Sequence, residues 1–128
     1  MMLLDTCVLY WLEQSPDRIT STAGTALADT TKGCFASGIS ALEIGLKVAS
    51  GTIRLPLTAG EWMHQICHRR GIVEIPVTFE IAGNSASLPP LHRDPFDRIL
   101  IATALEHGLT LLTPDRHIAQ YPGLKTLW

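Results

Sequence analysis

This sequence lacks several features by which common protein classes are recognised. It has only three cysteines, Cys7, Cys34 and Cys67, and no CxxC pair. We therefore expect small, buried, reduced thiols and no disulfide framework. The chain contains no apolar run of about 18 residues, so no membrane span is expected. An aspartate follows the first four residues, which leaves no room for a signal peptide. These absences predict a cytoplasmic protein.

The sequence also lacks a strong excess of charge of one sign, because it has 10 Lys and Arg and 12 Asp and Glu, for a net charge of -2. Such a balance argues against a protein that coats nucleic acid through excess positive charge. If several of the acids bind a metal, however, the remaining surface is slightly basic and nucleic acid stays possible. The sequence has no GxGxxG, Walker A or GxSxG motif, so nothing supports a dinucleotide, nucleotide triphosphate or serine hydrolase site.

What is present is a chain of 128 residues, 46% of them apolar, which is enough for the core of a single domain spanning residues 1–128. Short apolar runs alternate along it with amphipathic segments, a pattern typical of a parallel sheet covered by helices on both faces. The expected strands are 1–4, 34–36, 72–77, 109–112 and 125–127, the third of them at an edge because of Pro76. The expected helices are 7–13 (capped by Thr6), 19–31, 39–49, 58–70, 78–87 and 95–107.

The segment HRDPFDR at 92–98 combines a helix start with two carboxylates. Asp94 before Pro95 is typical of an N-cap followed by proline at the first helical position. Asp97 lies three residues further on, on the same face, where it either complements the helix dipole or binds a ligand. The helix is expected to end at Gly108.

Carboxylates also follow the expected strands. Asp5 and Asp115 come just after apolar strands, and Glu43 lies near the start of the helix that follows 34–36. Ser40 and Glu43 match a capping box, and turns or caps would explain each other acid taken alone. Ligands of parallel sheets gather at the carboxyl ends of the strands, and clustered carboxylates suit Mg²⁺ or Mn²⁺. The joint pattern therefore predicts a divalent metal site that activates water against a phosphodiester.

Three fragments together make the chain resemble the PIN-domain ribonucleases, specifically the VapC toxins of type II toxin–antitoxin pairs. They are LLDTCVLYW, SALEIGLKVASGTIRLP and LPPLHRDPFDRILIATALEHGLTLLTPD, in the order found in that family. The resemblance implies a three-layer α/β/α, Rossmann-like PIN fold with a mostly parallel sheet. It also implies Mg²⁺- or Mn²⁺-dependent endonucleolytic cleavage of RNA, a VapB-like antitoxin as partner, and a homodimer.

The same resemblance implies which residues form the site. The family's four acids fall on Asp5, Glu43, Asp97 and Asp115, which would bind the metal and carry catalysis. Accessory groups are then Thr6, Ser40, Thr113 and Asp94, the last as a helix cap or a group that supports the ligands. Arg93, Arg98 and Arg116 flank the acids and are candidates for contacts with RNA phosphates. One departure is Cys7, at a position that is often asparagine in the family.

Other interpretations remain open at this stage. The same fold serves as a non-catalytic RNA-binding or assembly module if the acids bind no metal. A receiver domain or an aspartyl phosphatase also has acids at strand ends. However, Cys7 occupies the place of the phosphatase's second aspartate, and no lysine stands at the late strand end that a receiver requires. His64, Cys67 and His68 lie near Glu61 on one expected helix, but a zinc site would need a second pair of ligands.

Overall fold

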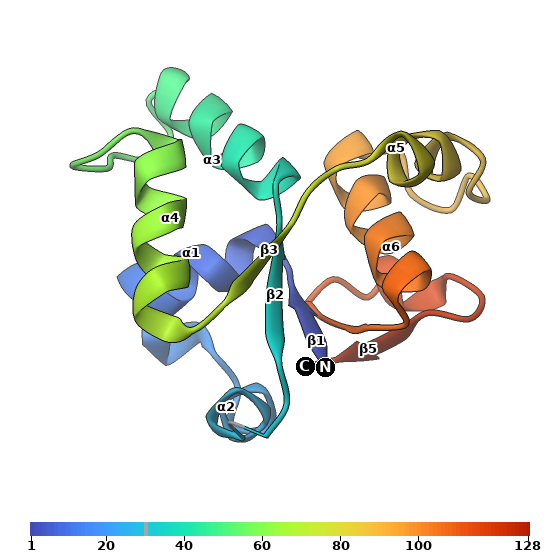
Figure 1. Ribbon diagram of the computed structural model, residues 1–128, viewed down its shortest axis with the longest axis horizontal. Helices are drawn as coiled ribbons and strands as arrows, with labels where there is room; N and C mark the ends of the chain where they lie inside the picture. The colour runs from blue at the N-terminus through green and yellow to red at the C-terminus, as the bar shows by residue number, and fades with distance from the viewer. Residues whose placement is uncertain (30) are drawn as a thin grey trace.

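The computed structural model describes residues 1–29 and 31–128, which form a parallel sheet between two layers of helices (Figure 1). The strand order is β3-β2-β1-β4-β5, and all four pairings are parallel. This confirms the three-layer α/β/α prediction. The strands are β1 (Met2–Leu4), β2 (Cys34–Ser37), β3 (Val73–Ile75), β4 (Thr110–Leu112) and β5 (Lys125–Leu127).

The helices divide between the two faces of the sheet (Figure 1). Four of them cover one face and the last two cover the other, where α5 and α6 pack against each other. They are α1 (Thr6–Gln14), α2 (Ser21–Ala28), α3 (Ile39–Ala49) and α4 (Ala59–Arg70) on the first face, and α5 (Phe79–Ala86) and α6 (Pro95–His107) on the second. Two short 3-10 helices, Pro16–Arg18 and Ile118–Gln120, lie in connections.

The two central strands bury side chains on both faces. Leu3 and Leu111 belong to the core beneath α5 and α6, whereas Leu4 and Leu112 belong to the core beneath α1 to α4. All four are fully buried, and each contributes roughly 1.5–3 kcal/mol of hydrophobic stabilisation. Because Leu4 pairs with Leu112, the residues that follow β1 and β4 emerge together at one edge of the sheet.

Several helix boundaries differ from the predicted ones. The segment expected to be helical at 19–31 is helical only at Ser21–Ala28, since Thr20 caps it by accepting from Ala23 N at 3.1 Å. Thr30, within the predicted range, lies outside the described residues. The predicted cap at Thr6 is wrong, because Thr6 is already helical and Asp5 precedes it without a side-chain capping bond.

The capping box predicted at Ser40 and Glu43 is also wrong. Helix α3 spans Ile39–Ala49 as predicted, but Gly38 is its N-cap and no side chain caps it within the described residues. A true capping box is present at α4, where Thr58 and Glu61 hydrogen bond to each other's backbone N–H groups. The hydroxyl of Ser40 and the carboxylate of Glu43 are therefore not used to start α3.

The start and end of α6 are as predicted. Asp94 Oδ1 accepts a hydrogen bond from Phe96 N at 2.9 Å, Pro95 is the first helical residue, and Gly108 ends the helix in the left-handed conformation with φ 63°. Strand β3 is an edge strand that stops before Pro76. In the part of the chain that the structure describes, no helix is both long and apolar enough to span a bilayer.

Candidate metal centre

The four predicted acids come from four separate parts of the chain, and the fold brings them toward one edge of the sheet. Asp5 directly follows β1, Asp115 follows β4 by three residues, Glu43 lies on α3, and Asp97 lies in the first turn of α6. The two central strands are in register, and α3 and α6 contact each other. The carboxyl edge of the sheet thus gathers the acids.

Asp5 is held by the strand opposite. Its backbone N donates to Leu112 O at 3.1 Å, and the hydroxyl of Thr113 donates to Asp5 Oδ2 at 2.5 Å. The side chain is nevertheless almost fully buried, with 6% of the residue exposed. Burial raises the pKa of this carboxyl above its ordinary value, although the Thr113 hydrogen bond acts in the opposite direction. Asp5 is a buried acid whose charge is only partly compensated by its neighbours.

Asp115 is oriented by the turn after β4. Thr113 Oγ1 accepts from Asp115 N at 3.1 Å, so this hydroxyl contacts both acids through its two roles. Asp115 Oδ1 accepts from His117 N at 2.8 Å. The short turn at 113–117 therefore fixes the directions of two carboxylates at once.

Asp97 is the third acid, and its surroundings disfavour its charged form. Burial raises the pKa of its carboxyl to about 7, and repulsion from Asp5, Asp94 and Glu43 adds to the effect while His92 opposes it. Asp97 belongs to two groups of three residues that could each hold a cation, because the ligand atoms within each group lie within 4.8 Å of one another. One group contains His92 and Asp115, and the other contains Glu43 and Asp94.

Glu43 contributes a polar atom that the protein itself does not satisfy. Among the described residues, its Oε1 is the one buried side-chain oxygen or nitrogen without a hydrogen-bond partner. Burial raises the pKa of the carboxyl, and repulsion from Asp5 adds to this. Thr6 Oγ1 and Ser40 Oγ hydrogen bond to each other at 2.8 Å, both fully or almost fully buried. That pair ties α1 to α3, the helix that carries Glu43.

The acidic site has the properties that a divalent cation requires of its ligands. A buried carboxylate oxygen without a donor is costly, and mutually repelling acids that share a site are typical of cation ligands. The four acids offer carboxylate oxygens, which suit Mg²⁺ and Mn²⁺. The residues present therefore fit such an ion.

Asp94 has two features at once. Its Oδ1 caps α6, as predicted, and one of its carboxylate oxygens also lies near those of Glu43 and Asp97. A cap and a place beside the acids are thus compatible, because the two oxygens of one carboxylate can serve different partners.

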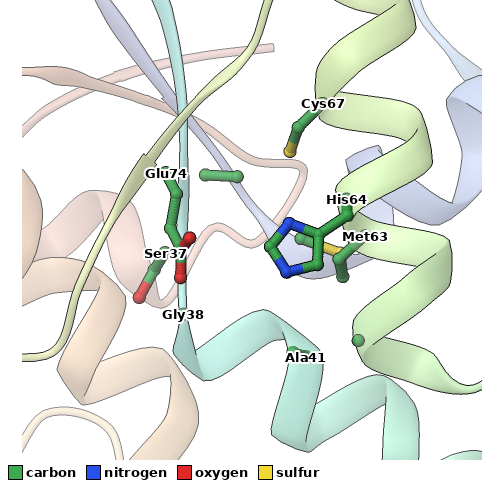
Figure 2. A pocket seen from close by; sticks show the side chains of 9 residues that line it. Ser37, Gly38, Ala41, Met63, His64, Cys67 and Glu74 are labelled. Atoms are coloured by element: carbon green, nitrogen blue, oxygen red, sulfur yellow. The ribbon is translucent and has the colours of Figure 1, made fainter.

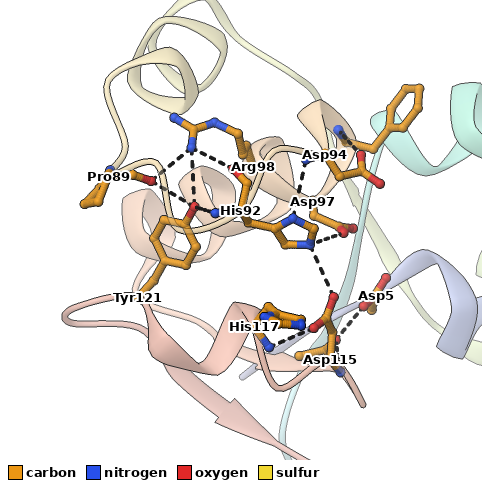
Figure 3. A network of polar contacts seen from close by, with 11 residues as sticks. Asp5, Pro89, His92, Asp94, Asp97, Arg98, Asp115, His117 and Tyr121 are labelled. Atoms are coloured by element: carbon orange, nitrogen blue, oxygen red, sulfur yellow. Dashed lines mark hydrogen bonds and ion pairs between the residues drawn. The ribbon is translucent and has the colours of Figure 1, made fainter.

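The three arginines expected to contact phosphate are not equivalent. Arg93 and Arg116 are exposed and make no ion pair within the described residues. Arg98 instead donates to backbone carbonyls, with Ser85 O and Leu88 O each 2.8 Å from Nη2. Its Nη1 donates to Pro89 O at 3.0 Å (Figure 3). A phosphate contact is therefore not supported for Arg98, because its donors already hold the loop between α5 and α6.

Two residues near the acids were missed from the sequence. His92 Nε2 lies 2.8 Å from Asp97 Oδ2 and 3.3 Å from Asp115 Oδ2 (Figure 3). Tyr121, buried at 2% exposed, accepts from His92 N at 2.9 Å and donates to Pro89 O at 2.9 Å. His92 is the first residue of the HRDPFDR segment, so its place five residues before Asp97 was the available signal. Nothing in the local pattern distinguished Tyr121.

The other histidines and cysteines form no second metal site in the described part of the chain. His64 and Cys67 line a cavity of about 80 Å³ between α4 and the sheet, together with Met63 and Glu74 (Figure 2). No group of three ligand atoms close enough to hold an ion includes them. The zinc alternative is therefore unsupported, and this cavity is mostly lined by apolar atoms.

Cys7, at the unusual position after Asp5 and Thr6, remains a thiol. Burial raises its pKa above the ordinary value, and the charges of Asp5, Glu43 and Asp97 raise it further. A neutral thiol neither adds to the repulsion nor acts as a thiolate ligand. All three cysteines are half-buried and unpaired, rather than fully buried as expected.

Comparison of the sequence with known proteins identifies the family of this chain. The family model described as PIN domain matches residues 2–124. Ribonuclease VapC22 of Mycobacterium tuberculosis is 30% identical over 130 residues, covering 99% of this chain and 98% of that protein.

Solved structures share the fold. VapBC2 from Rickettsia felis, bound to a DNA fragment from its promoter, has a TM-score of 0.72 at 16% identity, covering 98% of this chain and 96% of that one. A toxin-antitoxin complex from Klebsiella pneumoniae has a TM-score of 0.67 at 22% identity, covering 100% and 97%. With the family model matching nearly the whole length, the chain belongs to the PIN-domain family, and its sequence relative is a VapC ribonuclease.

Proposed function

We propose that this PIN-domain protein is a Mg²⁺- or Mn²⁺-dependent endoribonuclease that acts as the toxin of a VapBC-like toxin–antitoxin pair. The observation that carries the proposal is the convergence of Asp5, Glu43, Asp97 and Asp115 on one sheet edge, with raised pKa values at three of them. The similarity to Ribonuclease VapC22 over nearly the full length supports the choice of RNA as substrate.

Each acid has a separate part in this proposal. Asp97, which belongs to both groups of ligand atoms, would hold the cation most directly together with Asp5, and Asp115 and Glu43 would contribute through water or to a second ion. A bound cation supplies an activated water and stabilises the charge that develops on the phosphodiester under attack. The protein forms no covalent bond to the RNA.

The neighbouring hydroxyls and arginines orient ligands and substrate. Thr113 fixes the Asp5 carboxylate through its 2.5 Å hydrogen bond to Oδ2, which leaves Oδ1 for another partner. The Thr6–Ser40 pair holds α1 and α3 together beneath Glu43. Arg93 and Arg116 are exposed beside the acids and offer positive charge to RNA phosphates.

The proposed partner is a VapB-like antitoxin that covers the acidic edge and blocks the cation or the RNA. A homodimer is proposed on the same resemblance. Structures similar in fold are described as toxin–antitoxin complexes, from Klebsiella pneumoniae and from Rickettsia felis among others, and this supports the search for such a partner. A small reading frame next to this one is the place to look.

The test compares purified wild type with Asp5→Asn and Asp97→Asn. RNA cleavage should require Mg²⁺ or Mn²⁺, stop with a chelator and fall by at least about 100-fold in both variants, because each removes a ligand charge. Asp17→Asn, at an exposed aspartate that belongs to neither group of possible ligands, is the matched control and should cleave normally. Full activity of either ligand variant, or no metal binding by the wild type, would refute the proposal and favour a non-catalytic module.

A further inference from the structure

His92 stands between two of the acids without being one of the family's four. It lies in the loop that joins α5 to α6, and its Nε2 is 2.8 Å from Asp97 Oδ2 and 3.3 Å from Asp115 Oδ2. One nitrogen thus reaches carboxylates from the helix layer and from the turn after β4 (Figure 3). The imidazole is largely enclosed, with 19% of its side chain exposed, and its ring nitrogens contact only residues at this site.

The backbone of His92 is held on both sides. Its N–H donates to the hydroxyl of Tyr121 at 2.9 Å, and its carbonyl accepts from Arg98 Nη1 at 3.1 Å. The same guanidinium nitrogen donates to Pro89 O at 3.0 Å, and Tyr121 donates to that carbonyl as well. Because Tyr121 is buried and Arg98 makes several bonds along the loop, the direction of the imidazole is built into the fold.

The second ring nitrogen shows where the proton of a neutral imidazole sits. Nδ1 faces the backbone N–H of Asp94 at 3.4 Å and can only accept from it. Nε2 therefore carries the hydrogen and donates toward Asp97 and Asp115. A histidine that binds a metal through one nitrogen normally donates its other N–H to an acceptor, and here the partner of Nδ1 is a donor. This arrangement favours a hydrogen-bond donor over a direct metal ligand.

We propose that His92 is a positioning residue of the metal centre, whose Nε2–H holds the carboxylates of Asp97 and Asp115 in one relative orientation and so strengthens cation binding. The inference rests on the proposed function, since it assumes that Asp97 binds the cation. The Oδ2 atom of Asp97 contacts His92, so Oδ1 is the oxygen that would bind the cation. Partners of this kind typically contribute about 10–100-fold to metal affinity.

The experiment measures Mn²⁺ and Mg²⁺ affinity by calorimetry on the full chain, with folding checked by circular dichroism. His92→Ala removes the donor and should weaken binding of both ions by about 10–100-fold. His92→Gln replaces the imidazole with an amide whose N–H can donate from a similar position, so it should recover most of the lost affinity. A general loss of packing would not be repaired by glutamine.

His117→Ala is the matched control. The His117 ring lies next to that of His92, with centroids 6.2 Å apart, but the contact of His117 with Asp115 is made by its backbone N. This variant should bind both ions as the wild type does. A folded His92→Ala protein with wild-type affinity overturns the inference. It is also overturned if His92→Gln binds no better than His92→Ala while only Mn²⁺ binding is lost, because that pattern identifies the imidazole as a ligand.

Asp97→Asn separates failure of this inference from failure of the proposed function. If Asp97→Asn and wild type bind Mn²⁺ equally, the metal centre itself is wrongly placed. If Asp97→Asn abolishes binding and His92→Ala leaves it unchanged, the metal centre stands and only the positioning role of His92 is refuted.

Discussion

Replacing Asp97 with asparagine should stabilise the protein in the absence of divalent cations, even though it disables the proposed metal centre. Asparagine keeps an acceptor oxygen for His92 Nε2–H and has nearly the same shape. What it removes is a carboxyl whose pKa rises from 3.8 to about 7 because of burial and repulsion from Asp5, Asp94 and Glu43. The wild-type fold therefore bears the cost of ionising this group at alkaline pH.

The size of the effect follows from that pKa. A shift of this size, at about 1.36 kcal/mol per unit, gives an upper limit of about 4 kcal/mol. Because 14% of the Asp97 side chain is exposed, solvent partly screens these charges, and we expect a gain of about 1–2 kcal/mol at about pH 8.5. For 128 residues, this corresponds to an increase in Tm of about 4–7 °C.

The direction of the Asp97 pKa shift also determines how the stability of the fold changes with pH. The folded state binds the Asp97 proton more tightly than the unfolded state, so wild-type stability falls as pH rises from about 4 to 7. The gain from Asp97→Asn should therefore disappear near about pH 4, where both side chains are neutral. Thermal unfolding monitored by circular dichroism with a chelator present measures this directly.

A matched control is Asp29→Asn. The pKa of Asp29 is lowered by hydrogen bonds from Thr31, so its charge is favourable in the folded state and the substitution should not stabilise. If Asp97→Asn lowers the Tm at alkaline pH, or raises it equally at every pH, then ionisation of Asp97 does not destabilise the fold as described.

Three further predictions concern the cation, the loop before α6 and the core. The increase in Tm caused by Mn²⁺ should grow between about pH 5.5 and 8, because protons compete with the ion for Asp97; a constant increase would exclude Asp97 as a ligand. Arg98→Lys should lower the free energy of unfolding by about 2–3 kcal/mol in urea titrations, because an ammonium cannot reproduce the guanidinium that binds several carbonyls. Arg93→Lys, at an exposed arginine, should change the free energy of unfolding little, and equal effects of the two substitutions would contradict the hydrogen bonds described for Arg98. Ile101→Ala should cost about 2–5 kcal/mol, whereas Leu42→Ala, at an exposed leucine, should stay within about 0.5 kcal/mol; similar losses at both would argue against the described core.

Local signals in the sequence predicted most of the fold. The alternation of short apolar runs with helical segments was enough for the three-layer architecture, and Pro76 correctly indicated an edge strand. Asp94, Pro95 and Gly108 defined α6 because capping and left-handed turns depend on neighbouring residues alone. The grouping of acids at strand ends was predictable because parallel strands share one carboxyl edge.

The failures involve contacts between distant residues. Ser40 looked like a helix cap from its spacing to Glu43, but its hydroxyl bonds to Thr6, 34 residues away. Arg98 looked like a free cation beside the acids, whereas its partners are carbonyls of a loop whose path the sequence does not specify. The contact between His92 and Asp115 requires the turn after β4, 23 residues later. No local pattern encodes these pairs.

The central position of β1 has a consequence for when the acidic centre first exists in a newly made molecule. The first strand to be synthesised pairs with both β2 and β4, and the hydrogen bond between Asp5 and Thr113 joins residues 108 positions apart. A pairing between residues so far apart requires both strands to be present, so Asp5 gains this partner only after β4 has been synthesised. A nascent or truncated polypeptide that stops before β4 therefore lacks both the neighbour that holds Asp5 and the carboxylate of Asp115, and it cannot form the acidic centre however well its earlier helices fold.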